Sequence, residues 1–527
     1  MKISLYIQTI RYLKGKQIFY QIWYRIRKMK RIKISLIKKV SGFPLTLNEY
    51  IDKPETFIGN SSFCFLNNTE IVHDWHYKSN TKLWRYNLYY MDYLLLKNES
   101  IENKKEWINS FIIGISENEE ALESYPIALR CINWIKFISI SLPLISEHEK
   151  KQWDEALYRQ YILLYYAIEY HLLGNHLLED AFSLLFGGLY FKENKFYKKA
   201  VHLLKKELNE QILPDGAHYE LSPMYHEILL DRLLDCINAL KNNICFENQK
   251  QITSFMEEKA ELMLNWLSNI IYKDGTIPLL NDAAYGIAPD SQELFAYAKR
   301  LGIRWSERGL KESGYRKFIS DRFEMILDVA HIGPDYIPGH AHADTFSYEL
   351  RIDGKPFIID TGISTYEKNT RRQYERETQA HNTVQVAGQS SSKVWGGFRV
   401  ARRAKISYLK EENNRITARH NGFKQFGIEH QRIFELKDTD IIISDSLLPR
   451  SDKKGMNAIH LHPDIKILSV NQEIIQTNLA TFIFYGADKI WVEECKVAFE
   501  YNKLQPTKKI CIAFINRMKY VIQTDKL

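Results

Sequence analysis

The pattern of hydrophobic residues changes near residue 320, and this change limits what the chain can fold into. Before that point, apolar residues recur at helical spacing in windows that end at Gly-, Pro- or Asn-rich turns. We expect helices near residues 83–96, 102–115, 122–142, 147–172, 176–191, 194–212, 219–241 and 248–271. No fixed period repeats among them, which argues against a solenoid of tandem repeats.

After residue 320 the apolar runs become short, rich in β-branched and aromatic residues, and bounded by turn residues. They predict strands at residues 323–331, 346–352, 356–360, 383–386, 406–408, 415–419, 431–435, 440–445, 465–468, 481–485, 490–492 and 509–516. Such frequent turns indicate a mostly antiparallel β-sandwich. The expected fold class is therefore α+β, with a helical domain followed by a β domain and a ligand site between them.

The composition is that of a globular protein, with 45% hydrophobic residues and a formal net charge of +8. Basic residues crowd the amphipathic head of the chain, at Arg25, Arg27, Lys28, Lys30, Arg31, Lys33, Lys38 and Lys39. This cluster fits contact with an acidic membrane surface or nucleic acid, or a solvated helix face. We find no signal-peptide pattern, no spanning apolar run and no CxxC pair, which favours a soluble, cytoplasmic or membrane-peripheral chain with free thiols.

Two polar segments in the helical half are candidates for chemistry. The first is Gly174-Asn175-His176, where Asn175 either caps a helix or hydrogen-bonds a substrate carboxylate. The second runs from Asp215 to His226, and its Ser222-Pro223 pair predicts a helix start. Tyr225 and His226 are then expected in an exposed first turn. The alternative is that these polar residues only form the end of a helix and have no part in chemistry.

A third segment, Gly339-His340-Ala341-His342-Ala343-Asp344, opens the β half. If this segment is extended, His340 and His342 point the same way because side chains alternate along a strand. A divalent metal, with zinc favoured, is expected at His342, Asp360 and His381, with His340 left as a base or acid. The ion would be structural or supporting. Buried hydrogen-bonded histidines are the alternative.

Taken together, these segments resemble the heparinase II/III family of polysaccharide lyases. The resemblance rests on Asn175-His176, the Ser-Pro-x-Tyr-His segment at 222–226, the Gly-His-x-His-x-Asp segment at 339–344 and His381-Asn382-Thr383-Val384. Residues 84–88 (Trp-Arg-Tyr-Asn-Leu) and 130–134 (Arg-Cys-Ile-Asn-Trp) match as well. The resemblance extends over most of the chain beyond about residue 45.

The resemblance implies an N-terminal incomplete (α/α) toroid followed by a C-terminal antiparallel β-sandwich. It also implies β-elimination in an acidic polysaccharide that contains uronic acid. Asn175, with His176 beside it, matches the residue that neutralises the substrate carboxylate, and Tyr225 and His340 match the acid and base. Further substrate contacts are expected from Tyr219, Glu220, Arg371, Arg372 and Arg376.

The expected domains are a basic amphipathic head at 1–45, a helical toroid domain at 46–315 and a heparinase II/III-like β-sandwich domain at 316–527. Without a signal peptide, work beside polysaccharide synthesis or turnover at the membrane is favoured over extracellular degradation. A periplasmic location, as for exported family members, is the alternative. A non-catalytic or hydrolytic glycan-binding protein of capsule assembly is the second functional hypothesis. Nucleic acid is not an expected partner. The polysaccharide, the mode of chain cleavage and the oligomeric state stay open.

Overall fold

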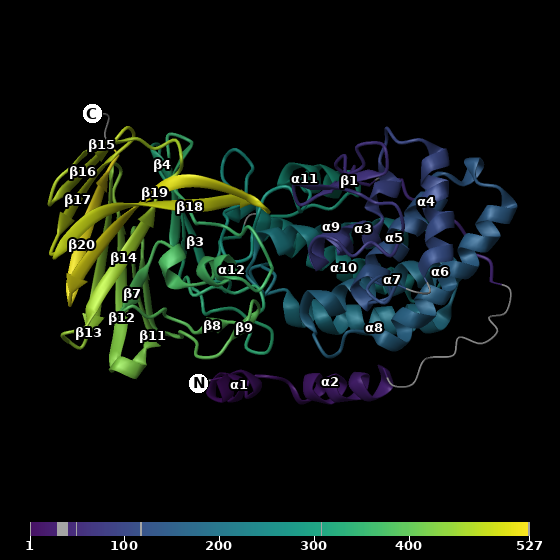
Figure 1. Ribbon diagram of the computed structural model, residues 1–527, viewed down its shortest axis with the longest axis horizontal. Helices are drawn as coiled ribbons and strands as arrows, with labels where there is room; N and C mark the ends of the chain where they lie inside the picture. Colours follow the sequence, from purple (N-terminus) through teal and green to yellow (C-terminus); the bar gives the residue numbers. More distant parts are fainter. Residues whose placement is uncertain (1, 29–39, 49, 116–117, 307, 525–527) are drawn as a thin grey trace.

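The computed structural model describes residues 2–28, 40–48, 50–115, 118–306 and 308–524. Part of the basic head, from Lys30 to Lys39, lies outside these residues. Helices fill the first part of the chain and strands the second, and Figure 1 shows the two parts packed end to end. The coarse fold predicted from the sequence, a helical domain followed by an antiparallel β domain, is confirmed.

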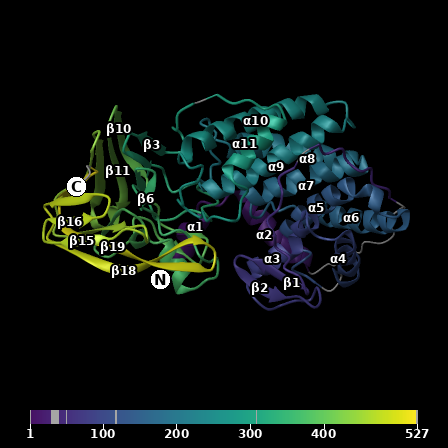
Figure 2. The same ribbon diagram turned by 90° about the horizontal axis from the view of Figure 1, so that it is seen from above.

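The helical part contains most of the helices. Those before residue 271 lie in windows that the apolar spacing predicts, whereas the helix at 291–300 was not predicted. Their bounds are α3 Lys82–Tyr90, α4 Ile101–Gly114, α5 Ser124–Ile140, α6 Glu147–Ala167, α7 Gly174–Phe191, α8 Asn194–Gln211, α9 Pro223–Asn242, α10 Gln249–Ile270 and α11 Ser291–Arg300. A hairpin of β1 (Ser62–Phe65) and β2 (Asn68–Ile71) lies beside α3, as Figure 2 shows.

Burial divides the long helices into two layers. Nearly every residue of α5, α7 and α9 is buried, whereas α6, α8 and α10 bury only one stripe of side chains. A helix that is apolar on all sides has other helices around it, and an amphipathic helix covers a core from one side. The helical part therefore has an inner layer of α5, α7 and α9 and an outer layer that α6, α8 and α10 help to form.

The second part is built from antiparallel sheets. The largest has the order β10-β11-β12-β13-β20-β17-β16-β15, and two four-stranded sheets have the orders β18-β19-β14-β7 and β3-β4-β5-β6. The strands are β3 Tyr315–Ile319, β4 Phe323–Asp328, β5 Tyr348–Ile352, β6 Lys355–Ile358, β7 Val384–Val386, β8 Val394–Trp395, β9 Arg399–Val400, β10 Ile406–Glu412, β11 Arg415–Phe423, β12 Ile428–Leu436, β13 Asp440–Leu448, β14 Lys454–His460, β15 Ile467–Val470, β16 Ile474–Thr477, β17 Thr481–Tyr485, β18 Lys489–Glu500, β19 Lys503–Ile515 and β20 Arg517–Gln523.

The inner faces of these three sheets share one hydrophobic core. Leu350 of β5, Phe434 of β12 and Ile512 of β19 belong to the same buried cluster. Along β12 and β13 buried and less buried residues alternate, as expected when one face of a sheet meets the core. The helical part has a separate core of its own.

Several contacts join the two parts. The turn of the long β18–β19 hairpin reaches the helical part, where Asn67 Nδ2 donates to the carbonyl oxygen of Tyr501 (2.9 Å). A short helix, α12 (Thr370–Glu375), places Arg372 against Asp282 of the helical part. Two helices at the start of the chain, α1 (Lys2–Ile10) and α2 (Gly15–Lys28), run along one edge of both parts (Figure 1). No helix among the described residues is long and apolar enough to cross a membrane.

Candidate active site

The first site residue, Asn175, lies in the first turn of α7. Leu173 and Gly174 before it have positive φ angles of 68° and 61°, which turn the chain sharply into the helix. A side chain at Gly174 would be strained by the positive φ, and its Cβ would lie 2.6 Å from Glu220 Oε1 and displace that carboxyl group. Glu220 in turn accepts hydrogen bonds from the backbone nitrogen (3.1 Å) and from Nδ2 (3.2 Å) of Asn175. The Asn175 side chain is therefore held in place by a buried carboxyl group and does not cap the helix.

The second site residue, Tyr225, lies in the first turn of α9. Ser222 caps this helix by accepting from the Tyr225 backbone nitrogen (3.2 Å), and Pro223 occupies the first helical position, as the sequence predicts. The Ser222 hydroxyl also donates to the carbonyl oxygen of Asp282 (2.6 Å). The helix cap thus ties Tyr225 to the loop that carries Asp282.

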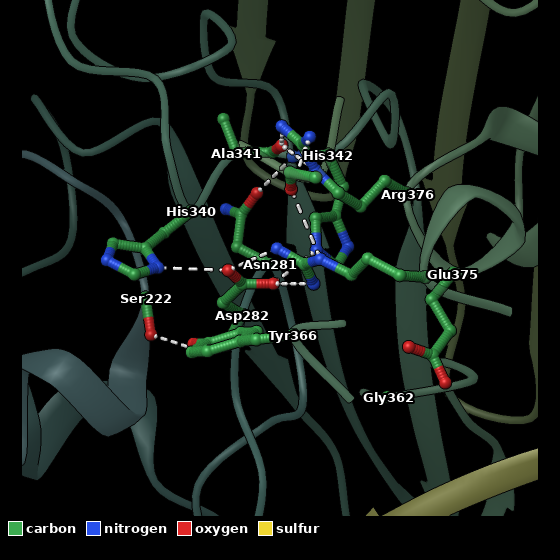
Figure 3. A network of polar contacts seen from close by, with 12 residues as sticks. Ser222, Asn281, Asp282, His340, Ala341, His342, Gly362, Tyr366, Glu375 and Arg376 are labelled. Carbon is green, nitrogen blue, oxygen red and sulfur yellow. Dashed lines mark hydrogen bonds and ion pairs between the residues drawn. The ribbon is translucent and has the colours of Figure 1, made fainter. Parts of the chain in front are cut away.

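His340 and His342 lie in a loop and not in a strand. They converge because both bind Asp282: His340 Nδ1 is 2.9 Å from Oδ2, and His342 Nε2 is 2.8 Å from Oδ1. Asn281 has a φ of 59°, a conformation that Asn tolerates better than most residues, and its Oδ1 accepts from the His342 backbone nitrogen (3.0 Å). Asp282 lies at the centre of the polar network drawn in Figure 3.

Asn175, Tyr225 and His340 meet at the junction of the two parts. His340 Nε2 is 3.2 Å from Asn175 Nδ2, and the rings of His340 and Tyr225 lie 3.8 Å apart between centroids. The Tyr225 hydroxyl is 3.1 Å from the hydroxyl of Tyr366. Because Asp282 accepts the proton on Nδ1, the network assigns the lone pair of His340 to Nε2, on the side of Asn175.

Electrostatics fix the protonation of this group. Although burial acts to raise the pKa of Asp282, Arg372 and the hydrogen bonds from His340 and His342 hold that pKa well below its usual value. Burial raises the pKa of Tyr225, and burial also raises the pKa of Glu220. The site therefore combines a charged aspartate and a neutral phenol with the imidazole of His340. Such a set can accept one proton and donate another.

His176 and Tyr219 lie near this group but face other partners. His176 Nδ1 is 2.8 Å from Glu169 Oε2, and its ring lies 4.6 Å from that of Tyr125. Burial acts to lower the pKa of His176, but Glu169 outweighs it and raises that pKa. Tyr219 accepts a hydrogen bond from the hydroxyl of Tyr336 (3.0 Å). The His176 side chain is partly exposed, so its imidazole can be reached by an anionic ligand.

The three predicted arginines have protein partners. Arg372 is buried and grips Asp282 with two hydrogen bonds of 2.5 and 2.7 Å. Arg376 is buried and donates to backbone carbonyls, among them those of Ala341 (2.8 Å) and Gly397 (2.7 Å). Arg371 pairs with Glu375 (2.7 Å). The prediction that Arg372 and Arg376 bind a sugar acid is therefore wrong. Both guanidinium groups are buried and already hydrogen-bonded to protein atoms.

The predicted metal ligands lie side by side. The rings of His342 and His381 are 5.2 Å apart between centroids, and His381 Nδ1 is 2.7 Å from Asp360 Oδ2. Among the described residues no three His, Cys, Asp or Glu side chains form a group that could hold a metal ion. Three polar atoms beside these ligands, however, are buried and have no hydrogen-bond partner among the described residues. They are His342 Nδ1, His381 Nε2 and Asp344 Oδ2. Imidazole nitrogens and carboxylate oxygens are the kinds of atom that bind a divalent metal, but Asp360 is already paired with His381 in this arrangement.

Two further outcomes concern residues near the site. His226 is fully buried, with Nδ1 accepting from the His218 backbone nitrogen (3.2 Å), so the expected exposed position is wrong. It follows Tyr225 on α9 but faces the core beside Trp266. Asp282 was not predicted, although an Asn-Asp pair directly after the apolar run 277–280 was a signal for it.

Two adjoining family models match the chain. The model described as "Heparinase II/III N-terminus" matches residues 154–298, and "Heparinase II/III-like, C-terminal" matches residues 303–523. Fold and site define a two-part protein with an acid–base group at the junction of its parts. Since the two models together cover more than half of the sequence, the chain belongs to the heparinase II/III family.

Curated relatives and solved structures agree with this assignment. The heparin-sulfate lyase of Pedobacter heparinus is 24% identical over 376 residues, which are 64% of this chain and 55% of that protein. The heparin-sulfate lyase of Bacteroides stercoris is 24% identical over 278 residues, 45% of this chain and 41% of that protein. The chain thus spans about half the length of the curated relatives it matches.

Two solved structures are similar to the chain over most of its length. Heparinase III has a TM-score of 0.68 at 15% identity, with 86% of this chain and 80% of that one covered. A mutant heparan sulfate lyase from Pedobacter heparinus has a TM-score of 0.61 at 18% identity, with 85% and 78% covered. At these identities the likeness shows the shared fold.

Proposed function

We propose that this chain is a polysaccharide lyase that cleaves an acidic, uronic-acid-containing polysaccharide by β-elimination. The observation that carries the proposal is the meeting of Asn175, Tyr225 and His340 at the junction of the two parts. The lyase names of the curated relatives agree with it. We propose that this lyase activity takes part in polysaccharide biosynthesis or turnover.

The reaction requires three groups in one place. The C5 proton of a uronate becomes acidic enough only when its carboxylate is neutralised. The Asn175 amide, with His176 nearby, would donate to that carboxylate. His340 Nε2 would then take the proton from C5. As the C4=C5 double bond forms and the C4–O bond breaks, the neutral Tyr225 phenol would give its proton to the departing oxygen.

Asp282 would support this step without contacting substrate. Its carboxylate fixes the His340 tautomer and stabilises the imidazolium that forms when Nε2 takes the proton. Arg372 keeps Asp282 charged. Burial of Glu220 favours its neutral form, so it would not repel a bound carboxylate.

The finer architecture is also proposed from the family. The two layers of helices support an incomplete (α/α) toroid, and the core shared by three sheets supports a β-sandwich. For the metal, we propose a divalent ion, with zinc favoured, at His342, Asp360 and His381. The unpaired His342 Nδ1 and His381 Nε2 support it. When bound, the ion would fix the loop at 339–344 to the start of β7. Elemental analysis of the purified protein, compared with that of His381→Ala, tests this ion.

A screen for unsaturated product tests the function. The purified chain is incubated with heparan sulfate, chondroitin sulfate, hyaluronan and the acidic glycans of the source organism. Ultraviolet absorbance then follows formation of the C4=C5 double bond. Absorbance that rises with wild type but not with His340→Ala supports the lyase. If every glycan binds and none yields an unsaturated end, the chain is a glycan-binding protein and the proposal is wrong.

A further inference from the structure

The charge of the chain is concentrated at its start. The first 48 residues contain twelve Lys and Arg and no Asp or Glu, whereas the whole chain has a net charge of +8, so residues 49–527 carry a net −4. A basic segment on an otherwise weakly acidic protein is attracted to an anionic surface through that segment alone. This feature has no part in the proposed elimination.

One side of α1 and α2 attaches the segment to both parts of the protein. On α1, the ring of Tyr6 meets that of Trp395 edge-on at 4.9 Å, and Thr9 Oγ1 accepts from Trp395 Nε1 (3.2 Å). On α2, Gln17 donates to the carbonyl oxygen of Leu172 (3.1 Å), and the Tyr24 hydroxyl donates to that of Ile168 (2.5 Å). Polar and aromatic side chains thus form the attachment.

The other side of the two helices is apolar and faces solvent. On α1 and α2 the exposed apolar side chains recur three, four or seven residues apart and so share one face of each helix. They are Ile3, Ile7, Ile10, Ile18, Phe19, Ile22, Trp23 and Ile26, each 38% to 77% exposed. Arg11, Lys16 and Arg25 are exposed beside them. A helix bound to a protein core normally buries this apolar face, so the arrangement is the reverse of the usual one.

We propose that the outward face of α1 and α2 is a docking surface for the headgroup region of an anionic lipid bilayer. A bilayer surface accepts a helix that lies flat, with Ile, Phe and Trp in the acyl boundary and Lys and Arg among acidic headgroups. An acidic polysaccharide would match the charge but not the exposed isoleucines. A second copy would bring two basic segments together, and like charges repel.

Docking through this face would also place the candidate site relative to the membrane. Leu172 and Tyr336, which receive the Gln17 side chain, lie next to elements of the site: Leu172 precedes Asn175, and the Tyr336 hydroxyl reaches Tyr219. Since α1 holds the β part and α2 the helical part, the two parts would bind the bilayer as one unit. Membrane binding would then bring the candidate site close to a polysaccharide located at the membrane.

Sedimentation with vesicles tests the proposal on the full chain. Wild type is mixed with vesicles of phosphatidylcholine containing a third phosphatidylglycerol, and with vesicles of phosphatidylcholine alone. The test variant is Phe19→Ser/Trp23→Ser, and the matched control is Leu468→Ser/Val470→Ser, which removes two equally exposed apolar residues from β15. All of these side chains are exposed, and thermal melting confirms that each variant folds.

We expect wild type and control to bind the anionic vesicles and the test variant to bind at least about tenfold more weakly, because the apolar anchors are lost. Binding should also weaken with added salt. No binding of wild type to anionic vesicles would overturn the proposal, and so would equal binding by the test variant. A dimer in light scattering that Phe19→Ser/Trp23→Ser abolishes, without vesicle binding, would identify a second copy as the occupant and overturn it as well.

Discussion

The ion pair between Asp282 and Arg372 gives the sharpest prediction about stability. Both side chains are buried, and they share two hydrogen bonds of 2.5 and 2.7 Å across the junction of the two parts. Removing one partner of a buried pair leaves an uncompensated charge and costs about 3–5 kcal/mol. Asp282→Asn and Arg372→Met should therefore each lower the unfolding midpoint by roughly 6–20 °C, at about 2–4 °C per kcal/mol.

A double-mutant cycle separates the interaction energy of the Asp282–Arg372 pair from the energy of each residue's other contacts. When both residues are replaced, neither charge is left buried alone, so the double variant should be more stable than the sum of the single losses by about 1–3 kcal/mol. Urea unfolding followed by circular dichroism measures all four proteins. Arg371→Gln, one residue earlier on α12 with a side chain 21% exposed, is the control and should shift the midpoint by well under half as much. Additive losses would refute the view that this pair holds the junction.

Three further changes should have distinct effects. Tyr225→Phe should lower kcat by at least about 100-fold and leave KM nearly unchanged, because the phenol acts as an acid and not as an anchor; steady-state assays on the best glycan decide this. Asn175→Ala should lower kcat/KM by about 100- to 1,000-fold, because the amide acts on the charge that develops in the transition state. Glu227 is buried, and burial raises its pKa to about 8, so the folded state holds this proton more tightly than the unfolded state. Stability from this proton is present at low pH and falls as pH rises toward 8, so at pH 9 Glu227→Gln should be more stable than wild type by roughly 1–4 kcal/mol, a gap that shrinks at pH 5.

Each of these predictions has a result that contradicts it. A Tyr225→Phe variant with full kcat would remove the phenol from the reaction. Weaker binding of Asn175→Ala with kcat intact would make the amide a simple anchor. If the urea midpoint changes with pH in the same way for wild type and for Glu227→Gln, this carboxyl group is ionised in the folded protein.

Helices were the most predictable part of the fold. Seven windows, from 102–115 to 248–271, closely match α4 to α10, because a helix that covers a core repeats apolar residues every three or four positions. Strands β3, β14, β16 and β20 were missed, as were the short strands β1, β2, β8 and β9. Strand β14 contains Gly455 and Asn457, and β16 has only four residues, so neither carries a long apolar alternation.

The site was predictable only where one short segment carries it. Asn175, Tyr225 and His340 each stand in a recognisable segment, and the structure brings the three together. Asp282 escaped notice because its role depends on partners 58 to 90 residues away, His340 and Arg372. Arg372 and Arg376 misled for the same reason: charge can be read from a sequence, but a buried partner cannot.

The most direct test of the central claim is the mass of the products formed in heavy-oxygen water. Elimination takes no oxygen from solvent, whereas hydrolysis places one solvent oxygen in a product. We predict that the susceptible glycan yields a pair of fragments, one unsaturated, with no heavy oxygen beyond the amount that free reducing ends exchange with the solvent, and that Tyr225→Phe and His340→Ala form neither. Saturated fragments that carry heavy oxygen would show that Asn175, Tyr225 and His340 do not serve an elimination.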